Sequence, residues 1–453
     1  MNPHVFRQYD IRGVADRDMP DAFARDLGCA LGTFWQRNGL RRVALGRDCR
    51  TSSDRLHGAL LEGLLEAGLQ IVDIGIVPTP LTYFAVFHLD LDGGVQITGS
   101  HNPPAENGFK MMKGKGSLFG DDIHTLRTLM EQRDFDCPGG GTVEEHDVLA
   151  AYAGFMRGNV SLERADVRFA IDAGNGAGGP AALAAMKAVG LSPVALLCEM
   201  DGAFPVHHPD PSQPENLEML REHVLREGLD VGIAYDGDAD RIGVIDARGE
   251  TVWGDRLMVL LSRALLRDHP GAAILGEVKC SQTLYDDIDA HGGRPILWKT
   301  GHSLIKTKMK QEKALLAGEM SGHIFFADRY FGYDDAIYAT LRLLEILAAA
   351  DRPLHDLIGD LPETHSTPEL RVECADEIKF DVVRRVLEHY RSTHEVVDVD
   401  GARIAFDGGW GLVRASNTQP VLVLRFEASS ADRLAAIRDE VEAVVHTARG
   451  DAT

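Results

Sequence analysis

Three aspartates stand at alternate positions in residues 236–241, which read DGDADR. The strand-like run VGIAY precedes them, and in an extended segment side chains at every second position fall on one side. The spacing therefore predicts that Asp236, Asp238 and Asp240 converge, where their charges repel unless a cation lies between them. Oxygen-only ligation suits a hard ion such as Mg²⁺, which keeps positions for water or phosphate. With the positive charge of Arg241 beside it, this loop is typical of a site that handles phosphate.

Two other interpretations of this loop were weighed. An EF-hand would place Gly where Arg241 stands and Glu where Ala247 stands, so calcium binding of that type is excluded. A solvated acidic turn is the remaining alternative, because Asp and Gly are common in turns. Strict alternation directly after an apolar run favours the metal site.

Ser100 is the second candidate, within residues 95–104 (VQITGSHNPP). The strand-like start delivers Ser100 into a turn, and Pro103 stops regular pairing. A serine held in this way can carry a covalent group. Taken alone, the segment could be an ordinary polar turn, and the acyl-transfer motif G-x-S-x-G does not fit, because Thr98 and Asn102 occupy its glycine positions. The presence of the three aspartates favours the functional interpretation of Ser100, because a phosphoserine oxygen would supply a further ligand to Mg²⁺.

Length and composition describe an ordinary globular protein. The 453 residues exceed what one core usually serves, so about two to four domains are expected. A net charge of −22 argues against a nucleic-acid or anionic-membrane partner. The six cysteines form no C-x-x-C pair, which indicates reduced thiols rather than disulfides or zinc. Without a signal-like start, or an apolar stretch of the ~18 residues that a membrane helix needs, we expect a soluble, cytoplasmic protein.

Short apolar runs alternate with helical patterns up to about residue 350. This alternation predicts α/β layers. The expected helices are residues 22–36, 54–67, 180–189, 215–227, 256–267 and 334–350. The expected strands are residues 43–45, 71–76, 94–98, 167–171, 193–198, 231–235, 273–275 and 296–298.

The pattern also contains a hint of internal repetition. Residues 43–48, 169–174 and 273–277 each end a strand in a turn of Gly, Asp or Glu, which suggests repeated α/β domains. After Pro362 the alternation of apolar runs and helical patterns stops, and a polar linker extends to Pro368. A helix over 379–391, a strand over 421–426 and a helix over 430–446 then predict a small, separate α+β domain.

Five motifs, taken in order, resemble the α-D-phosphohexomutase family, and above all its bacterial phosphomannomutase/phosphoglucomutase branch. They are residues 6–13 (FRQYDIRG), 98–103 (TGSHNP), 236–241 (DGDADR), 318–323 (GEMSGH) and 413–420 (VRASNTQP). The resemblance therefore spans nearly the whole chain. Two departures remove no functional side chain: Gly99 stands where Ala is usual, and Ala239 where Gly is common.

The resemblance implies an α/β fold with three similar α/β domains, each with a mixed sheet, and a smaller C-terminal α+β domain, all around a central cleft. Each domain is expected to contribute one loop to the cleft. The expected domains are residues 1–148 (phosphoserine), 149–252 (metal-binding), 253–362 (sugar-binding) and 363–453 (phosphate-binding).

The resemblance also implies the site residues. Those with catalytic roles are Ser100, Lys110, His323 and Arg12, with Lys110 and His323 as candidates for general base and acid. The expected metal ligands are Ser100, Asp236, Asp238 and Asp240. The expected substrate-binding residues are Tyr9, Arg12, His101, Asn102, Arg241, Lys279, His302, Glu319, Ser321, His323, Arg414, Ser416, Asn417 and Thr418.

The chemistry of these side chains suits the implied roles. Glu319 and Ser321 can grip adjacent sugar hydroxyls, and by resemblance these are the 3- and 4-hydroxyls that glucose and mannose share. Arg414 offers a guanidinium fork to a phosphate dianion. Arg12 and Tyr9 are expected to orient the substrate near Ser100. Basic side chains from all four domains are expected to make a positive cleft in an acidic protein, which focuses anionic sugars inward.

The implied reaction interconverts hexose 1- and 6-phosphates through phosphorylated Ser100 and a hexose 1,6-bisphosphate. Mg²⁺ is the expected cofactor and glucose 1,6-bisphosphate the expected activator. Phosphosugars are the expected partners of a protein that acts as a monomer.

Three alternatives stay open at this point. Residues 174–179 satisfy G-x-G-x-x-G between a strand and a helix, with Glu199 at the distance of a ribose-binding acid, so a dinucleotide-dependent oxidoreductase is possible. A non-enzymatic sugar-phosphate sensor would need no chemistry at Ser100. The third alternative is a phosphoglucosamine mutase, which belongs to the same family. By resemblance, Met320 and the pair Asn417 and Thr418 favour glucose and mannose as substrates instead.

Overall fold

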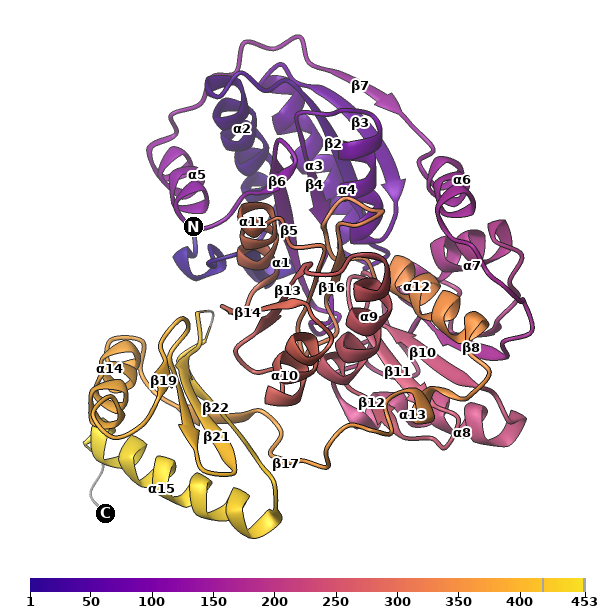
Figure 1. Ribbon diagram of the computed structural model, residues 1–453. Helices are drawn as coiled ribbons and strands as arrows, with labels where there is room; N and C mark the ends of the chain where they lie inside the picture. The colour runs from indigo at the N-terminus through magenta and orange to yellow at the C-terminus, as the bar shows by residue number, and fades with distance from the viewer. Residues whose placement is uncertain (418, 451–453) are drawn as a thin grey trace.

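The computed structural model describes residues 1–417 and 419–450, which are built on four β-sheets (Figure 1). Three sheets lie close together in one body. The fourth belongs to the C-terminal part, which an extended linker joins to that body. Three α/β units with mixed sheets and a smaller α+β unit are the fold that the sequence predicts.

The first sheet has the order β1-β5-β4-β2-β3-β7, with β6 paired to β5. Its strands are β1 (Ile11–Val14), β2 (Arg42–Arg47), β3 (Gln70–Ile76), β4 (Gly93–Ile97), β5 (Glu106–Lys113), β6 (Gly116–Ser117) and β7 (Thr142–Glu145). Its helices are η1 (Pro3–Val5), α1 (Ala15–Asp18), α2 (Asp21–Arg37), α3 (Ser53–Glu66), α4 (Thr79–His88) and α5 (Asp121–Gln132). Helix α2 buries Phe23, Leu27 and Leu31, whose spacing of four residues places them on one face.

The second sheet has the order β12-β11-β10-β8-β9, and the third β14-β13-β15-β16. The second unit contains α6 (Leu149–Asn159), β8 (Phe169–Asp172), α7 (Gly178–Ala188), β9 (Val194–Leu196), η2 (Pro214–Leu217), α8 (Glu218–Glu227), β10 (Val231–Tyr235), β11 (Ile242–Asp246) and β12 (Thr251–Val252). The third contains α9 (Gly254–Asp268), β13 (Ala273–Glu277), α10 (Gln282–Ala290), β14 (Arg294–Trp298), α11 (His302–Glu312), β15 (Leu316–Gly318), β16 (Ile324–Phe326), α12 (Ala336–Ala349) and α13 (Leu354–Leu357).

The three α/β units repeat one topology. Strands β3-β2-β4-β5, β9-β8-β10-β11 and β14-β13-β15-β16 follow each other in the same spatial order, and only the last pair of each set is antiparallel. The three sequence segments that hinted at repetition form β2, β8 and β13, so they occupy equivalent positions. In each unit the loop between the last two strands carries one candidate motif, which explains how the three motifs come to face one another.

The C-terminal unit is an antiparallel sheet of order β17-β22-β21-β20-β19, with β18 also paired to β22. Its elements are β17 (His365–Ser366), β18 (Leu370–Glu373), α14 (Lys379–Tyr390), β19 (Val396–Val397), β20 (Ala402–Phe406), β21 (Gly409–Ala415), β22 (Val421–Ala428) and α15 (Ala431–Arg449). Helices α14 and α15 cover the sheet and close a separate hydrophobic core around Val386, Phe426 and Val441.

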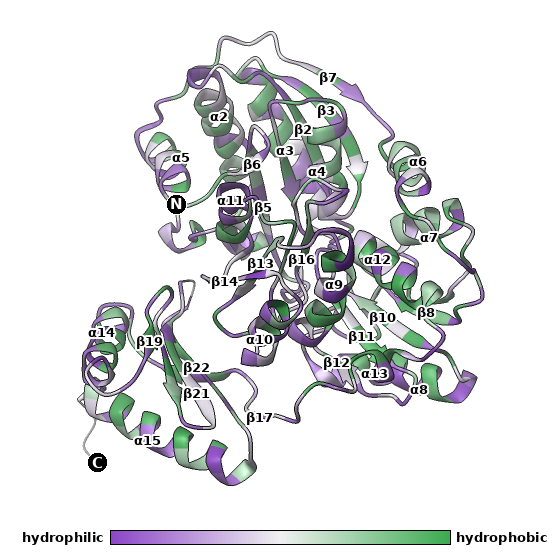
Figure 2. Cartoon of the chain, in the orientation of Figure 1, coloured by the Kyte–Doolittle hydropathy of each residue, from purple (hydrophilic) through white to green (hydrophobic). Residues whose placement is uncertain are grey.

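Hydrophobic packing joins the first three units and leaves the fourth distinct. One cluster of buried apolar side chains runs through all three α/β units, with Phe84 5.3 Å from Tyr152 and 6.3 Å from Phe331 between ring centroids. In Figure 2 the apolar colour gathers along the central strands and on the helix sides that face them. Between the third and fourth units, a small apolar cluster packs Val278 against Trp410 and Leu412, and the buried Arg403 side chain donates to the carbonyls of Val278 and Cys280. The body is therefore one packed block, and the C-terminal unit has its own core.

Several element boundaries differ from the sequence prediction for local reasons. The helix expected over 215–227 begins as a 3-10 turn and becomes α-helical at Glu218. Helix α12 starts at Ala336 because the Asp335 side chain caps it, accepting from the Tyr338 N–H. Strand β9 covers only three residues of the expected six. Within the described ranges, no helix combines the length and apolar character needed to cross a membrane.

Candidate active site

Ser100 lies in the turn between β4 and β5 and is buried. Its φ is 49°, a left-handed conformation that costs a serine roughly 1–3 kcal/mol and is concentrated at functional sites. The Ser100 N–H donates to Thr98 Oγ1 at 2.9 Å, and its hydroxyl donates to Asp236 Oδ2 at 2.5 Å. The ring nitrogen Nδ1 of His101 lies 3.2 Å from the same hydroxyl. The candidate nucleophile is therefore in direct contact with the aspartate loop.

The loop that carries Ser100 contacts strand β1 through the side chain of Arg12. Arg12 on β1 donates from Nη1 to Asn102 Oδ1 at 2.8 Å, and its other terminal nitrogen pairs with Asp10 at 2.6 Å. Burial keeps the pKa of His101 well below its usual value, so its ring is neutral. This hydrogen bond places Arg12 beside the serine loop, to which Asn102 belongs. The roles of Arg12 and Asn102 toward a substrate stay predictions.

The three aspartates converge, but for a different reason from the one predicted. Residues 236–241 form the turn between antiparallel β10 and β11, not an extended strand end. Ala239 has a φ of 54°, and its N–H donates to Asp236 O at 3.0 Å. Asp236 Oδ1 accepts from the N–H groups of Asp240 and Arg241, both at 3.1 Å. The turn itself, and not the strand pleat, gathers the side chains on one side.

The aspartate cluster fits a divalent cation. All three residues are fully buried, and one oxygen from each lies within 4.8 Å of the others. Burial and the charges of Asp238 and Asp240 raise the pKa of Asp236 well above its usual value. Asp238 Oδ1 has no hydrogen-bond partner among the described residues. Buried, oxygen-only donors with an unsatisfied oxygen suit a hard ion such as Mg²⁺.

Lys110 places its ammonium between two of these carboxylates. From β5, its Nζ lies 2.7 Å from Asp238 Oδ2 and also bonds Asp240 Oδ2. Burial alone would lower the pKa of Lys110, but the two carboxylates outweigh it and hold the pKa well above its usual value. In this arrangement Lys110 is a cation, and acting as a base would require its separation from the carboxylates.

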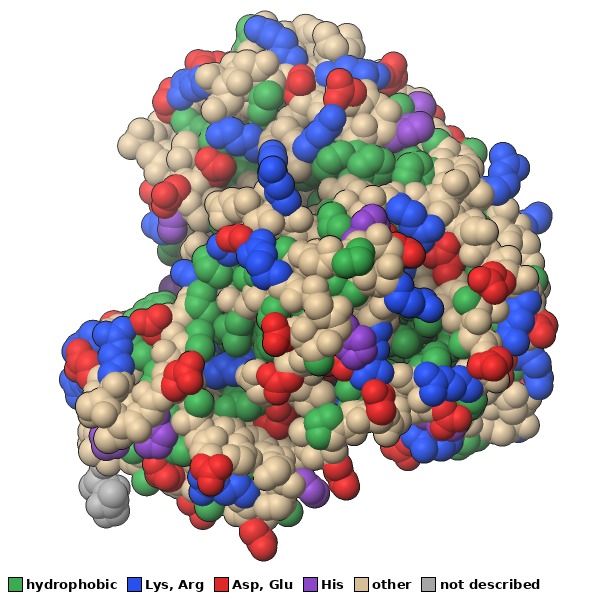
Figure 3. Space-filling model, viewed as in Figure 1, with side chains coloured by type: hydrophobic (Ala, Val, Ile, Leu, Met, Phe, Trp, Pro, Cys, Tyr) green, Lys and Arg blue, Asp and Glu red, His purple; other side chains and the backbone are tan. Residues whose placement is uncertain are grey.

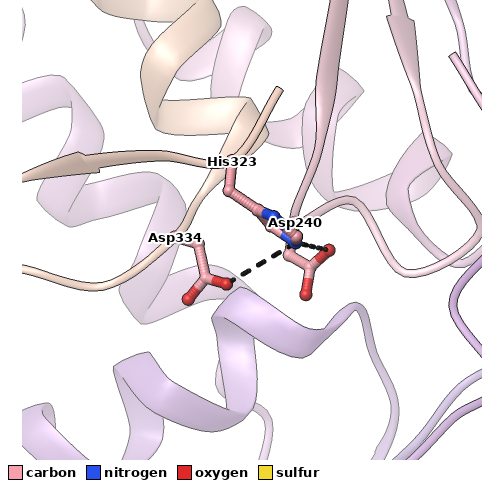
Figure 4. A group of neighbouring side chains, drawn as sticks. All are labelled: Asp240, His323 and Asp334. Atoms are coloured by element: carbon pink, nitrogen blue, oxygen red, sulfur yellow. Dashed lines mark hydrogen bonds and ion pairs between the residues drawn. The ribbon is translucent and has the colours of Figure 1, made fainter. Parts of the chain in front are cut away.

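His323 connects the aspartate loop to the third unit. Figure 4 shows its ring directed at Asp240, with Asp334 beside it. Its Nε2 lies 3.2 Å from Asp240 Oδ1 and 3.9 Å from Asp334 Oδ2, and its Nδ1 lies 2.6 Å from Glu319 Oε2. Burial opposes the charged ring, but the neighbouring carboxylates, Asp240 first, raise the pKa of His323 to about 9. Its Nε2 also lies 3.4 Å from Arg241 Nε, so His323 and Arg241 stand together.

Glu319 and Ser321 occupy the loop between β15 and β16. Glu319 Oε1 accepts from the Gly301 N–H at 2.6 Å, and Ser321 Oγ lies 3.3 Å from Glu319 Oε2. Burial would raise the pKa of Glu319, yet the hydrogen bond from His323 and nearby charges lower it to about 2. The acceptor and the hydroxyl thus lie side by side, as two adjacent sugar hydroxyls require.

His302 and Tyr9 lie next to this loop. His302 begins α11, with its ring centroid 5.8 Å from that of His323 and 6.3 Å from that of Tyr9. Burial holds the pKa of His302 well below its usual value. The Tyr9 hydroxyl donates to Thr300 O at 3.2 Å and accepts from Asn417 Nδ2 at 2.8 Å. The Tyr9 hydroxyl therefore contacts the third and fourth units, and the expectation that Tyr9 orients the substrate near Ser100 stays a prediction.

The C-terminal unit presents the remaining candidates at the same junction. Arg414 Nε donates to Asp400 Oδ2 at 3.0 Å, and the same oxygen accepts from the Thr300 N–H at 3.1 Å. Lys279, which follows β13, pairs with Glu369 at 3.1 Å. Ser416 Oγ accepts from the Gln419 N–H at 3.2 Å. The candidate Thr418 lies outside the described residues.

Models of one protein family match almost the whole length of the chain. Four of them, for the phosphoglucomutase/phosphomannomutase alpha/beta/alpha domains I, II and III and the C-terminal domain, match residues 3–136, 150–249, 253–365 and 369–444. The chain belongs to the phosphoglucomutase/phosphomannomutase family. The four matched segments follow the four sheets in chain order.

Individual relatives agree with this assignment. A phosphomannomutase/phosphoglucomutase of Pseudomonas aeruginosa is 43% identical over 435 residues, which cover 96% of this chain and 94% of that protein. A phosphoglucomutase of Neisseria gonorrhoeae is 42% identical over 447 residues, covering 98% and 97%. The crystal structure of a family protein from Burkholderia thailandensis superposes with a TM-score of 0.94 at 40% identity and covers 100% of this chain and 99% of that one.

Charge in this family member is more balanced around the site than expected. Four of the five predicted basic side chains have a carboxylate beside them: Arg12 with Asp10, Lys110 with Asp238 and Asp240, Lys279 with Glu369, and Arg414 with Asp400. On the face in Figure 3, Lys and Arg also alternate with Asp and Glu. A phosphate dianion that binds here must compete with these carboxylates for the cations, and the positive cleft stays a prediction.

Sequence reasoning missed four side chains around the site: Asp334, Lys306, Thr79 and Arg50. Asp334 is fully buried and pairs with Lys306 at 2.9 Å, below His302 and His323. Thr79, at the start of α4, donates its hydroxyl to Asp238. Arg50 lies buried under the serine loop. The sequence did hold a signal for Arg50, because it follows the expected strand 43–45, and α/β sheets bind ligands beyond the carboxyl ends of their strands.

The glycine-rich residues 174–179 have a packing role in this fold. A Cβ at Gly176 would lie 2.6 Å from Gly237 O, and one at Gly178 would lie 2.6 Å from the Ala239 Cβ. The Ala177 N–H donates to Gly237 O at 2.9 Å. These glycines let the start of α7 pack against the aspartate loop, so the space that a dinucleotide pyrophosphate would need is filled by protein.

Proposed function

We propose that this protein is an intramolecular phosphotransferase that interconverts the 1- and 6-phosphates of glucose and mannose. Phosphorylated Ser100 would give its phosphoryl group to the free hydroxyl of a hexose phosphate, and the resulting 1,6-bisphosphate would return its other phosphate to Ser100. The observation that carries the proposal is the 2.5 Å contact between the Ser100 hydroxyl and Asp236 inside a buried carboxylate cluster. The names of the relatives at 41–44% identity support the substrate pair.

Mg²⁺ is the proposed cofactor, held by Asp236, Asp238, Asp240 and an oxygen at Ser100. When bound, it supplies positive charge to the oxygens of the transferring phosphoryl group. The protein adds Arg241 and Lys110 on the same side. Phosphate monoesters react so slowly in water that charge neutralisation and positioning must provide most of the acceleration.

Proton transfer accompanies each phosphoryl transfer. The attacking sugar hydroxyl loses a proton as its oxygen bonds phosphorus, and Ser100 Oγ regains one as its bond to phosphorus breaks. His323 and Lys110 are the proposed partners in this exchange. His323, with a pKa raised to about 9, is protonated at neutral pH and suits the acid role, and its Nδ1 contact with Glu319 fixes the ring.

Sugar and phosphate recognition are assigned to the third and fourth units. Glu319 and Ser321 would bind the 3- and 4-hydroxyls, a pair identical in glucose and mannose, so either epimer at C2 fits. Arg414, Ser416, Asn417 and Thr418 would hold the phosphate that does not react. Because the C-terminal unit has its own core and a linker to the body, its closure could exclude water from the phosphoserine.

The same boundaries are proposed for the domains, at residues 1–148, 149–252, 253–362 and 363–453, supported by the four matched segments. A cytoplasmic monomer remains our proposal for the working form, since each loop of the site comes from one chain. A dinucleotide-dependent activity is disfavoured by the packed glycines, and tight NAD(H) binding without mutase turnover would reverse this choice.

A coupled assay tests the proposed function. Glucose 1-phosphate, mannose 1-phosphate and glucosamine 1-phosphate are supplied separately with Mg²⁺ and glucose 1,6-bisphosphate. Turnover of the first two at comparable rates, with glucosamine 1-phosphate much slower, is the expected result. Preference for glucosamine 1-phosphate would identify a phosphoglucosamine mutase, and no turnover of any of the three would defeat the mutase proposal.

Removal of the metal should abolish activity and lower thermal stability together. After treatment with EDTA, Mg²⁺ should restore turnover and raise Tm, because a ligand at about 100 times its Kd stabilises by about 2.7 kcal/mol. Calorimetry of wild type and Asp238→Asn measures the second effect without any substrate. A Tm that rises equally in both proteins would place the ion elsewhere.

Replacing Arg414 by lysine should weaken substrate binding more than chemistry. Lysine keeps the charge but loses the planar fork that grips a phosphate through two bonds. We expect KM to rise on the order of tenfold, with kcat changed much less. Steady-state kinetics with glucose 1-phosphate measure both, and Arg438→Lys, on the exposed part of α15, is the matched control. A fall in kcat with an unchanged KM would contradict the clamp role.

A further inference from the structure

Arg50 holds the loop that carries Ser100 through its main chain. Its side chain is completely buried just after β2. Nη1 donates to the carbonyls of Pro103 (2.7 Å) and Glu106 (2.9 Å), and Nη2 to those of Ser100 (2.7 Å) and Asn102 (2.7 Å). One guanidinium thus satisfies four carbonyls that the loop turns inward.

Asp48 complements the arginine on the other side of the same loop. Its Oδ2 lies 3.2 Å from Arg50 Nε and accepts from the Gly99 N–H, also at 3.2 Å. Its Oδ1 accepts from Ser53 Oγ at 2.6 Å and from the Arg50 N–H at 3.0 Å. The buried charge is therefore paired, and the pair holds the N–H before Ser100 as well as the carbonyls from Ser100 onward.

The surroundings leave the guanidinium little room to move. A Cβ at Gly99 would lie 2.5 Å from Arg50 Cζ, so the family departure at this position coincides with close packing of the arginine. From the second unit, the Phe204 ring centroid lies 5.0 Å from Arg50 Cζ, and Gly202 forms a β-bridge with Arg50. The guanidinium is thus enclosed between the serine loop and a loop of the second unit.

We propose that Arg50 is a positioning residue for phosphoryl transfer. With Asp48 it fixes the main chain of residues 99–106, so that Ser100 keeps its left-handed conformation and its oxygen stays against Asp236. Arg50 touches neither the Ser100 hydroxyl nor the aspartates, and it acts only through the carbonyls. Without the hydrogen bonds from Arg50 to these carbonyls, the strained turn can relax, because a serine keeps a left-handed conformation only where the surrounding structure holds it there. This inference rests on the proposed mutase function and adds a residue to it.

Arg50→Lys is the main test. A lysine ammonium keeps the charge but cannot present the fork that reaches four carbonyls. We expect kcat to fall on the order of a hundredfold, the effect of a displacement of about 1 Å at the reacting atoms. KM for glucose 1-phosphate should stay within about twofold, because sugar and phosphate are bound by other loops. Phosphorylation of Ser100 by glucose 1,6-bisphosphate, followed by intact-protein mass spectrometry, should slow in parallel.

Matched controls separate positioning from folding. Arg47→Lys changes an arginine at the end of the same strand whose partner, Asp54, is exposed, and its kinetics should equal those of wild type. Asp48→Asn keeps the shape of the carboxylate but removes its charge, and should lower kcat with KM unchanged, as Arg50→Lys does. The rise of Tm with Mg²⁺ reports whether the aspartate loop is intact in each variant.

Several outcomes would overturn the proposal. Among them are an unchanged kcat in a folded Arg50→Lys protein, or a loss confined to KM. If Arg50→Lys does not fold, the Asp48→Asn protein becomes the test. An unaltered kcat in a folded Asp48→Asn protein would also overturn the proposal. A wild-type protein without mutase turnover would instead defeat the proposed function itself, so the two failures are distinguishable.

Discussion

Ser100→Ala should lose essentially all mutase turnover. Removal of a covalent nucleophile costs on the order of 10⁶-fold in kcat, and the structure offers no second hydroxyl in contact with Asp236 among the described residues. Folding should be preserved, because alanine removes only one oxygen from a turn that Arg50 and Thr98 hold through the main chain. Coupled turnover of glucose 1-phosphate, with Tm as the fold check, measures the effect.

The control for this variant is Ser117→Ala, which changes a serine of the same unit outside the site. It should behave as wild type. A Ser100→Ala protein that keeps its turnover would contradict the phosphoserine mechanism. If wild type binds sugar phosphates without turning them over and Ser100→Ala binds them equally well, the sensor alternative is favoured.

Asp240→Asn should impair both catalysis and stability. Asp240 pairs with Lys110 and lies 3.2 Å from His323 Nε2, all in a buried site. Loss of one partner from a buried charge pair costs about 3–5 kcal/mol, and we expect a smaller loss here because Asp238 still pairs with Lys110. We expect kcat to fall by about 10²–10³, as when one preorganised charge is removed from a reaction centre. Chemical denaturation and steady-state kinetics measure the two losses.

Asp246→Asn is the matched control, since Asp246 is equally buried on the same hairpin but binds the turn after β11 instead of the cluster. It should affect stability and leave the Mg²⁺ dependence of turnover unchanged. An Asp240→Asn protein whose kcat and Mg²⁺ requirement equal those of wild type would show that Asp240 does not hold the ion.

Local chemistry could be predicted from the sequence because the motifs are short and contiguous. Asp236, Asp238 and Asp240 converge whether the segment is extended or turned, so the cluster was predicted correctly and only its backbone was wrong. Ala239 makes the turn in a left-handed conformation that alanine rarely adopts, so the residue itself does not indicate it, although glycine is common at this position by resemblance. The repeat was visible in the strand ends that became β2, β8 and β13, since equivalent strands end in equivalent turns.

Contacts between distant segments could not be predicted in this way. Arg50 meets carbonyls 50 to 56 positions away, and Asp334 meets Lys306 across 28. Tyr9 belongs to the first unit, yet its hydroxyl accepts a hydrogen bond from Asn417, 408 positions along the chain. Two basic side chains also find a carboxylate far away in the sequence, Lys110 with Asp238 and Lys279 with Glu369, and only the packing of the fold brings these pairs together.

The central claim is that Ser100 carries the phosphoryl group beside a cation held by the aspartate loop. The most direct test is to incubate the protein with glucose 1,6-bisphosphate labelled in its phosphates, with and without Mg²⁺, and to map the label by peptide mass spectrometry. We predict one phosphoryl group, on Ser100 alone, which glucose 1-phosphate removes when Mg²⁺ is present. Label on a different residue, or full turnover with Ser100 never phosphorylated, would contradict the account.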